Sequence, residues 1–208
     1  MLTSLSVNDF LDEIASSSPA PGGGSVSALA AALGAALTSM VSRLTIGKKK
    51  YTGVQGEMEE VLKQSEKLRA QFKEIIDEDT AAYNKVMSAY GLPKDTEEQK
   101  SKRTAEIQEA MKTATLVPLK LMNLCVEALE LVKLIAEQGN QSAISDTGVA
   151  ALMLRAGCEG AALNVLINLN SMQDKVFVDA KKAIANTVRK SVSDDFQHIL
   201  DRLNGKIF

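Results

Sequence analysis

The segment SVSALAAALGAALTSMVS occupies residues 25–42 and contains no charged side chain. Alanine, its commonest residue, is the strongest intrinsic helix former, and small residues such as Gly34 let a neighbouring helix approach closely. The segment is about long enough to cross a bilayer, but its alanine, serine and glycine fit a tightly packed, buried helix better. We therefore predict a core helix here and no membrane partner.

The composition of the whole chain favours helices as well. Aromatic residues make up 4% of the 208 residues and tryptophan is absent, so the runs that strands favour are scarce. No linker divides the chain, which indicates a single domain over residues 1–208. The net charge of -2 offers no basic field for nucleic acid. The acidic start of the chain argues against a secretory signal, so a cytoplasmic location is expected.

Apolar residues at helical spacing predict about six helices in an all-α, elongated bundle. The helix ending near Ala89 would be on the order of 50 Å long. Pro118 lacks a backbone donor, which predicts a kink or break in its helix. The expected helices are a short one capped by Ser6, one from about Gly24 to Leu44, one after Gly53 to Ala89, one over 97–137, one starting after Ser145–Asp146, and one from Gln173 or Asp174.

Three loops depart from the helical pattern and are the candidate binding segments. The first is PGGGS at 21–25, which includes Gly22, Gly23, Gly24 and Ser25. Free backbone N–H groups at the start of the following helix could bind a carboxylate or phosphate. A structural turn with Ser25 as the helix cap explains the same residues.

The second loop is LTIGKKKY at 44–51. Here Lys48, Lys49 and Lys50 stand beside Tyr51, and such a group could hold an anionic ligand tail. The alternative is a charge run that is merely solvated.

The third loop is GNQSAISDTG at 139–148, a polar bridge between apolar helices. It contains Asn140 and Asp146. The alternative to a catalytic role is that Asp146 only caps a helix.

Taken together, these segments resemble the formimino-tetrahydrofolate cyclodeaminase and methenyl-tetrahydrofolate cyclohydrolase family. The resemblance is carried by PAPGGGSVSALAAALGAAL at 19–37, LTIGKKKY at 44–51, DEDTAAYNKVMSAYGLPK at 77–94, SDTGVAAL at 145–152 and NVLINL at 164–169. It implies an all-helical homodimer acting on a one-carbon unit held between N5 and N10 of tetrahydrofolate. Folates carry a glutamate or polyglutamate tail, whose carboxylates the three lysines would meet. The glycine turn would approach either the tail or the ring.

The implied chemistry needs general acid–base help. The only histidine, His198, is remote from all three loops in sequence. A carboxylate is therefore the more economical base, and it could also stabilise a cationic substrate. Asp146 is the first candidate, and Asp79 is the second because it lies in the DEDTAAY segment one helical turn from Tyr83. For Asp79 the alternative is a solvated charge on a helix face.

Three asparagines could supply neutral hydrogen bonds to the pterin edge, or else tie helices together. They are Asn140, Asn164 and Asn168, and the last two share a helix face at i, i+4 spacing. The sequence does not separate cyclohydrolase from cyclodeaminase activity. The absence of the formiminotransferase domain found in the bifunctional animal member favours the cyclohydrolase.

The remaining sequence features concern cofactors, the oligomeric state and the competing class of function. One histidine and no clustered thiols predict neither a metal nor a redox cofactor, and Cys125 and Cys158 are expected to pack in the core. Small-residue helices over 25–42 and 148–161 would present faces that one short chain does not cover, which predicts a homodimer whose site could straddle the interface. A folate-binding module without turnover, or a purely structural helical bundle, is the competing class.

Overall fold

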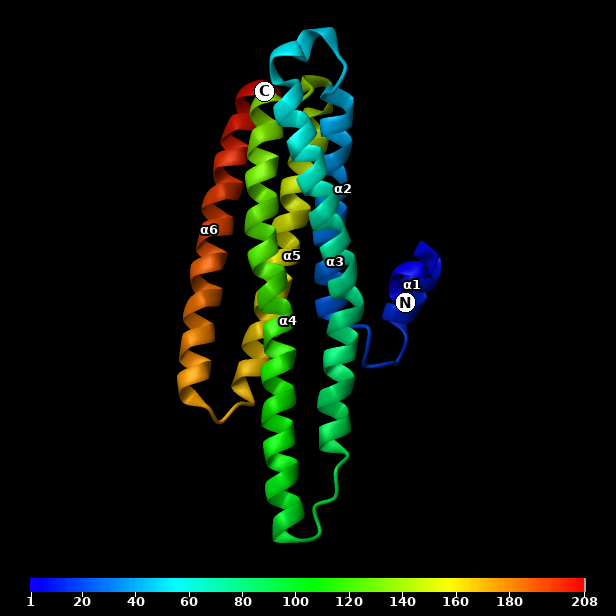
Figure 1. Cartoon of the computed structure of the whole chain (residues 1–208), viewed down its shortest axis with the longest axis vertical. Coiled ribbons are helices and arrows are strands. Elements are labelled where there is room, and N and C mark those ends of the chain that lie inside the picture. Colours follow the sequence, from blue (N-terminus) through cyan, green and yellow to red (C-terminus); the bar gives the residue numbers. More distant parts are fainter. Residues whose placement is uncertain (208) are drawn as a thin grey trace.

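The computed structural model describes residues 1–207, and within that range every regular element is a helix. The α-helices are α1 (Val7–Ala15), α2 (Gly23–Thr45), α3 (Gln55–Tyr90), α4 (Glu97–Gln138), α5 (Ile144–Asn170) and α6 (Lys175–Ile207). Short 3-10 turns occupy Leu2–Ser4, Lys49–Val54 and Gln141–Ala143. The expected all-α bundle of six helices is confirmed (Figure 1).

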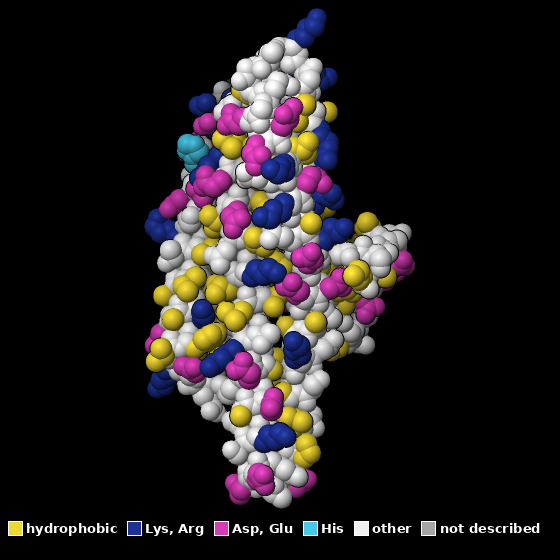
Figure 2. All heavy atoms as spheres, in the orientation of Figure 1, with side chains coloured by type: hydrophobic (Ala, Val, Ile, Leu, Met, Phe, Trp, Pro, Cys, Tyr) yellow, Lys and Arg dark blue, Asp and Glu magenta, His cyan; other side chains and the backbone are white. Residues whose placement is uncertain are grey.

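Four helices form the core of the molecule. α2 packs against α3 and α5, and α4 packs against the same two helices, which closes a four-helix bundle. α6 lies along α4 and α5, whereas α1 stands beside the bundle (Figure 1). The outer side of α4 and α5 is therefore covered by α6. Within residues 1–207 the outer side of α2 and α5 has no such long helix over it, and the short α1 reaches only the part of α2 around Leu29 and Leu33. On the face formed by α3, α4 and α6, side chains of both charge signs are interspersed (Figure 2).

α2 is the core helix that its small residues predict. Ala28 and Ala31 are fully buried. A Cβ atom at Gly34 would lie 2.7 Å from Leu154 Cγ, so the glycine is what allows α5 to approach so closely. The helix begins at Gly23 with Gly22 as its N-cap. The alternative that Ser25 caps this helix is therefore wrong, because Ser25 lies inside the first turn.

α4 runs for 42 residues through Pro118, so the break that was one of the two expected effects of this proline is absent. A proline leaves the carbonyl four residues earlier without its usual N–H donor. That carbonyl belongs to Ala114, and the side-chain Nδ2 of Asn168 on α5 donates to it at 2.8 Å. Because another helix supplies the missing donor, the backbone group is satisfied and the helix continues.

Two helical segments, Gly23–Thr45 and Gln141–Asn170, are long and apolar enough to span a membrane by length and composition. In the apolar window of the first, 61% of residues are buried in the bundle, and in that of the second 44%. Core helices of soluble proteins meet this criterion as well, so it does not by itself indicate a membrane. The lower burial of the second segment reflects the uncovered side of the bundle.

Candidate active site

A cavity of about 300 Å³, called the glycine pocket below, opens where the start of α2 meets α3, α4 and α5. Its walls combine the turn before α2 with one face of each of the other three helices. The lining residues are Pro19, Ala20, Gly22, Gly23, Gly24, Asp79, Ala82, Tyr83, Val86, Met111, Ala114, Asn164, Ile167 and Asn168. Segments as far apart in sequence as Pro19 and Asn168 thus meet, and they include six of the residues predicted for the site.

Asp79 is the carboxylate of the glycine pocket, and it lies against the first turn of α2. The Ser25 hydroxyl is 3.2 Å from Asp79 Oδ2 and 2.9 Å from the Ile76 carbonyl oxygen. Burial raises the pKa of Asp79, and hydrogen bonds from the Ser25 hydroxyl and backbone N–H offset part of that rise. A carboxyl group whose pKa is raised toward neutrality is suited to general acid–base catalysis. The alternative of a solvated charge is therefore wrong for Asp79.

Ser25 itself is completely buried behind Asp79 and is absent from the pocket lining. The structure thus assigns it contact with the carboxylate rather than with a ligand. Gly24 lies directly under the same carboxylate, since a Cβ atom there would be 2.1 Å from Asp79 Oδ1.

Asn164 and Asn168 both line the pocket, and both have their amide nitrogens engaged. Asn164 Nδ2 donates to the Gly160 carbonyl at 2.9 Å, and Asn168 Nδ2 donates to the Ala114 carbonyl at 2.8 Å. Their side-chain oxygens are left as acceptors. With Asp79 included, the pocket is rich in acceptors and suits a ligand that presents N–H donors.

Tyr83 is the polar side chain of the pocket that the predicted site omits. It lies one helical turn after Asp79 on α3, so the i, i+4 spacing is the signal that could have included it. The remaining walls are apolar and come from Ala82, Val86, Met111 and Ile167. An apolar slot with a few polar groups is typical of small-molecule sites.

The other predicted residues lie at the far end of α2. Tyr51 Oη accepts the Gln141 N–H at 3.0 Å, and Asn140 Nδ2 donates to the Leu44 carbonyl at 2.8 Å. Tyr51 and Asn140 therefore tie the two loops of that end together. The exposed Lys48, Lys49 and Lys50 belong to the same end.

Asp146 also lies at that end, in the first turn of α5. The helix begins at Ile144 after Ala143, so the alternative that Asp146 is only the N-cap of this helix is wrong. α2 has 23 residues, which separates its ends by about 33 Å at 1.5 Å per residue. Within one chain, neither Asp146 nor the lysine loop reaches the glycine pocket.

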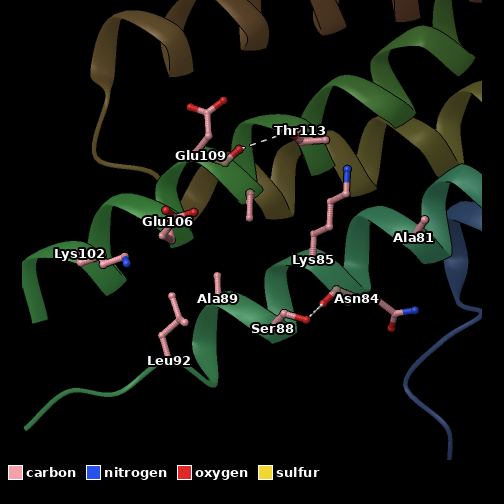
Figure 3. Close-up of a pocket in the computed structure, with 11 residues that line it drawn as sticks. Ala81, Asn84, Lys85, Ser88, Ala89, Leu92, Lys102, Glu106, Glu109 and Thr113 are labelled. Atoms are coloured by element: carbon pink, nitrogen blue, oxygen red, sulfur yellow. Dashed lines mark hydrogen bonds between the residues drawn. The ribbon is translucent and has the colours of Figure 1, made fainter. Parts of the chain in front are cut away.

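A larger hollow of about 680 Å³ lies between the end of α3 and the start of α4 (Figure 3). Its polar lining includes the exposed Lys85, Lys102 and Glu106. The Ser88 hydroxyl donates to the carbonyl of Asn84 in its own helix, as Thr113 does to that of Glu109 (Figure 3). None of the predicted site residues lines this hollow. The glycine pocket is therefore the candidate active site.

Other potential catalytic groups are placed away from the glycine pocket. Cys125 and Cys158 are buried in the core, as expected, and burial raises the pKa of the Cys158 thiol to about 12. Neither is suited to act as a thiolate. His198 is exposed on α6. Among residues 1–207, no three His, Cys, Asp or Glu side chains are grouped so that they could hold a metal ion.

Comparison with known proteins identifies the family of the chain. The model of the formiminotransferase-cyclodeaminase family matches residues 6–187. A methenyltetrahydrofolate cyclohydrolase from Methylorubrum extorquens is 49% identical over 175 residues, which are 84% of each chain. A formimidoyltransferase-cyclodeaminase from Rattus norvegicus is 40% identical over 85% of this chain, which spans only 32% of that relative. The fold also matches the crystal structure of a formiminotetrahydrofolate cyclodeaminase from Thermotoga maritima, with a TM-score of 0.91 and 30% identity. This match covers 100% of both chains.

Proposed function

The chain belongs to the formiminotransferase-cyclodeaminase family, and on that premise we propose that it hydrolyses 5,10-methenyltetrahydrofolate to 10-formyltetrahydrofolate. The observation that carries the proposal is the half-buried carboxylate of Asp79 in a small, acceptor-rich pocket. The 49% identity to a methenyltetrahydrofolate cyclohydrolase supports the same reaction.

In the proposed reaction, water attacks the carbon of the methenyl bridge, which shares a positive charge with N5 and N10. Asp79 removes one proton from the water as the C–O bond forms, giving a neutral carbinol. The protonated Asp79 then delivers that proton to N5 while the C–N5 bond breaks. The hydroxyl proton leaves to solvent as the formyl C=O forms. Because the carbon is already electrophilic, the proposal needs no metal or redox cofactor.

The polarity of the glycine pocket supports a folate ligand. A carboxylate beside a cationic amidine lowers the energy of the bound substrate and of charged states along the reaction. A pterin ring presents several N–H donors along one edge, which the acceptor oxygens of Asn164 and Asn168 could bind. The apolar walls would pack against the faces of the ring.

The alternative activity is cyclodeamination of formiminotetrahydrofolate with release of ammonia. Full-length similarity to the Thermotoga maritima cyclodeaminase favours it. Here N10 attacks the formimino carbon, and ammonia leaves after protonation. The same carboxyl group would serve as the acid, so one pocket could catalyse either reaction.

We also propose that the active enzyme is a homodimer in which two chains complete each site. The uncovered sides of α2 and α5 carry apolar residues three, four, seven or eleven positions apart, which places them on one side of each helix. They are Val26, Leu33 and Leu44 on α2, and Val149, Leu152, Leu163 and Ile167 on α5, all between 41% and 66% exposed. Ile167 also lines the glycine pocket, so the pocket borders this face.

The direction of α2 and α5 supports an antiparallel arrangement of the two chains in this homodimer. α2 runs from the glycine pocket to the lysine loop, whereas α5 runs back. A two-fold axis perpendicular to both helices at mid-length exchanges the two ends. It would bring the lysine loop and Asp146 of one chain to the glycine pocket of the other. The tail carboxylates of a folate in the pocket could then meet Lys48, Lys49 and Lys50.

The experiment that tests the function is a direct assay with purified protein. Loss of methenyl absorbance on incubation with 5,10-methenyltetrahydrofolate, faster than the uncatalysed reaction, is expected. A parallel incubation with formiminotetrahydrofolate measures released ammonia. Turnover only of the second substrate would replace the cyclohydrolase with the cyclodeaminase, and turnover of neither would refute both.

A further inference from the structure

We propose that Ser25 is a positioning residue whose hydroxyl holds Asp79 in both of its protonation states during turnover. The inference rests on the proposed function, in which the same carboxyl group first accepts and then returns a proton. It also assigns a purpose to the third glycine and the serine of the GGGS motif.

The geometry around the Ser25 hydroxyl carries this inference. The oxygen is fully buried, so it has no bulk water as a partner. It lies 2.9 Å from the Ile76 carbonyl oxygen and 3.2 Å from Asp79 Oδ2. A hydroxyl has one hydrogen to donate and can accept through its lone pairs. It therefore donates to only one of these two acceptors at a time.

The two acceptors match the two states of the carboxyl group. When Asp79 is ionised, the Ser25 hydroxyl donates to Oδ2 and stabilises the charge. When Asp79 takes a proton from water, it does so at Oδ1, the oxygen that the Ser25 hydroxyl does not contact. Oδ2 is then a carbonyl acceptor, so the Ser25 hydroxyl can keep its hydrogen bond to Oδ2 or turn its hydrogen to the Ile76 carbonyl. Thr80 Oγ1, 3.3 Å from the Ser25 oxygen, adds a second hydroxyl to this cluster. No heavy atom has to move between the two states, because the Ser25 hydroxyl contacts Oδ2 and not Oδ1.

Gly24 supplies the space that the arrangement needs. A Cβ atom at this position would lie 2.1 Å from Oδ1 and 2.6 Å from Oδ2 of Asp79. Any other residue here would push the carboxylate away from the start of α2. The third glycine and the serine therefore act together on one side chain of α3.

Few titratable or charged groups surround Asp79. Of the residues that line the pocket, α2, α4 and α5 contribute no titratable side chain, and α3 contributes only Tyr83 besides Asp79. The ion pair of the neighbouring Glu78 with Lys120 of α4 lies at the surface, with both side chains more than 40% exposed. A change at Ser25 should therefore be felt by Asp79 without a competing charged partner.

The test replaces Ser25 by Ala and by Cys and follows kcat/KM for methenyltetrahydrofolate against pH. Both variants lose the strong O–H donor, and Cys preserves most of the side-chain volume. Because the charged form of Asp79 loses a hydrogen bond, the acid limb should move to higher pH by about one unit. The matched control is Ser27→Ala. The Ser27 hydroxyl donates to the carbonyl of Gly23, four residues earlier in the same helix, and not to Asp79.

An acid limb that stays at the wild-type pH in a folded Ser25→Cys protein would overturn the proposal, as would an equal shift in Ser27→Ala. If Ser25→Ala fails to fold, Ser25→Cys decides. Titration of the Asp79 carboxyl carbon by NMR gives the same comparison without substrate. A shifted titration in a protein that turns over neither folate would refute the proposed function but leave the Ser25–Asp79 coupling intact.

Discussion

At the residue scale, burial of Asp79 has opposite consequences for chemistry and for stability. Burial raises the pKa of this carboxyl group above its value in the unfolded chain. The folded state therefore binds more protons than the unfolded state between the two pKa values. As pH rises through that window, the free energy of unfolding loses the stabilisation that the extra bound proton gives the folded state. No part of that stabilisation is regained at neutral pH.

This linkage gives a prediction for Asp79→Asn. Turnover should fall by roughly a hundredfold or more, because the amide cannot accept a proton. The urea midpoint at neutral pH should stay equal to or exceed that of the wild type, since the variant buries no charge. Steady-state kinetics and equilibrium unfolding on the same preparation check both parts. Normal turnover would remove Asp79 from the catalytic role and leave Asp146 as the candidate.

The preference between the two aspartates shows where prediction from sequence stops. The segments that contain both were identified from their residues, and six predicted residues do line one pocket. The choice of Asp146 over Asp79 depended on the SDTG turn, which is a local signal. Contact between Ser25 and Asp79 joins positions 54 residues apart, and only the packing of α2 on α3 brings them together.

At the element scale, the helices themselves were largely predictable. The Ser6 cap of α1 and the start of α4 at residue 97 are confirmed, and Thr96 caps α4 in a capping box with Gln99. Local periodicity and turn residues determine such features. The uninterrupted course of α4 was not predictable, because the donor that satisfies the Ala114 carbonyl comes from α5.

The contact between Ala114 and Asn168 leads to a prediction for Pro118→Ala. Alanine restores the N–H that points at the Ala114 carbonyl, so it competes with Asn168 for that acceptor. We expect KM for the folate to rise severalfold while the melting temperature is unchanged or higher, since alanine favours helix. Pro93→Ala, in the turn between α3 and α4, is the control for removing a proline. An unchanged KM would show that Asn168 does not depend on Pro118.

At the scale of the whole molecule, the predicted site residues form two groups at opposite ends of one chain. The first contains Asp79, and the second contains Lys48, Lys49, Lys50 and Asp146. The sequence suggested an interface from small-residue helices over 25–42 and 148–161, and both helices do leave apolar side chains uncovered. Which ends meet across the interface depends on the rotation axis, which no local pattern specifies.

A site completed by two chains and a site confined to one chain predict different results when two inactive variants are mixed. One variant carries Asp79→Asn, and the other carries Lys48→Ala, Lys49→Ala and Lys50→Ala together. The second is assayed with a polyglutamylated folate at a concentration where tail binding limits the rate. Each variant alone should be nearly inactive, because every site in its homodimer has the same defect.

When equal amounts of the two variants are unfolded together and refolded, half of the dimers should contain one chain of each kind. In such a dimer the antiparallel arrangement places both defects in one site and leaves the other site intact. Activity should therefore recover to about a quarter of the wild-type value. Wild-type protein taken through the same refolding sets the reference, and each variant refolded alone sets the background. If mixing restores nothing while cross-linking shows mixed dimers, the lysines and Asp79 do not serve a common site across the interface, because a dimer with sites confined to single chains keeps one defect in each.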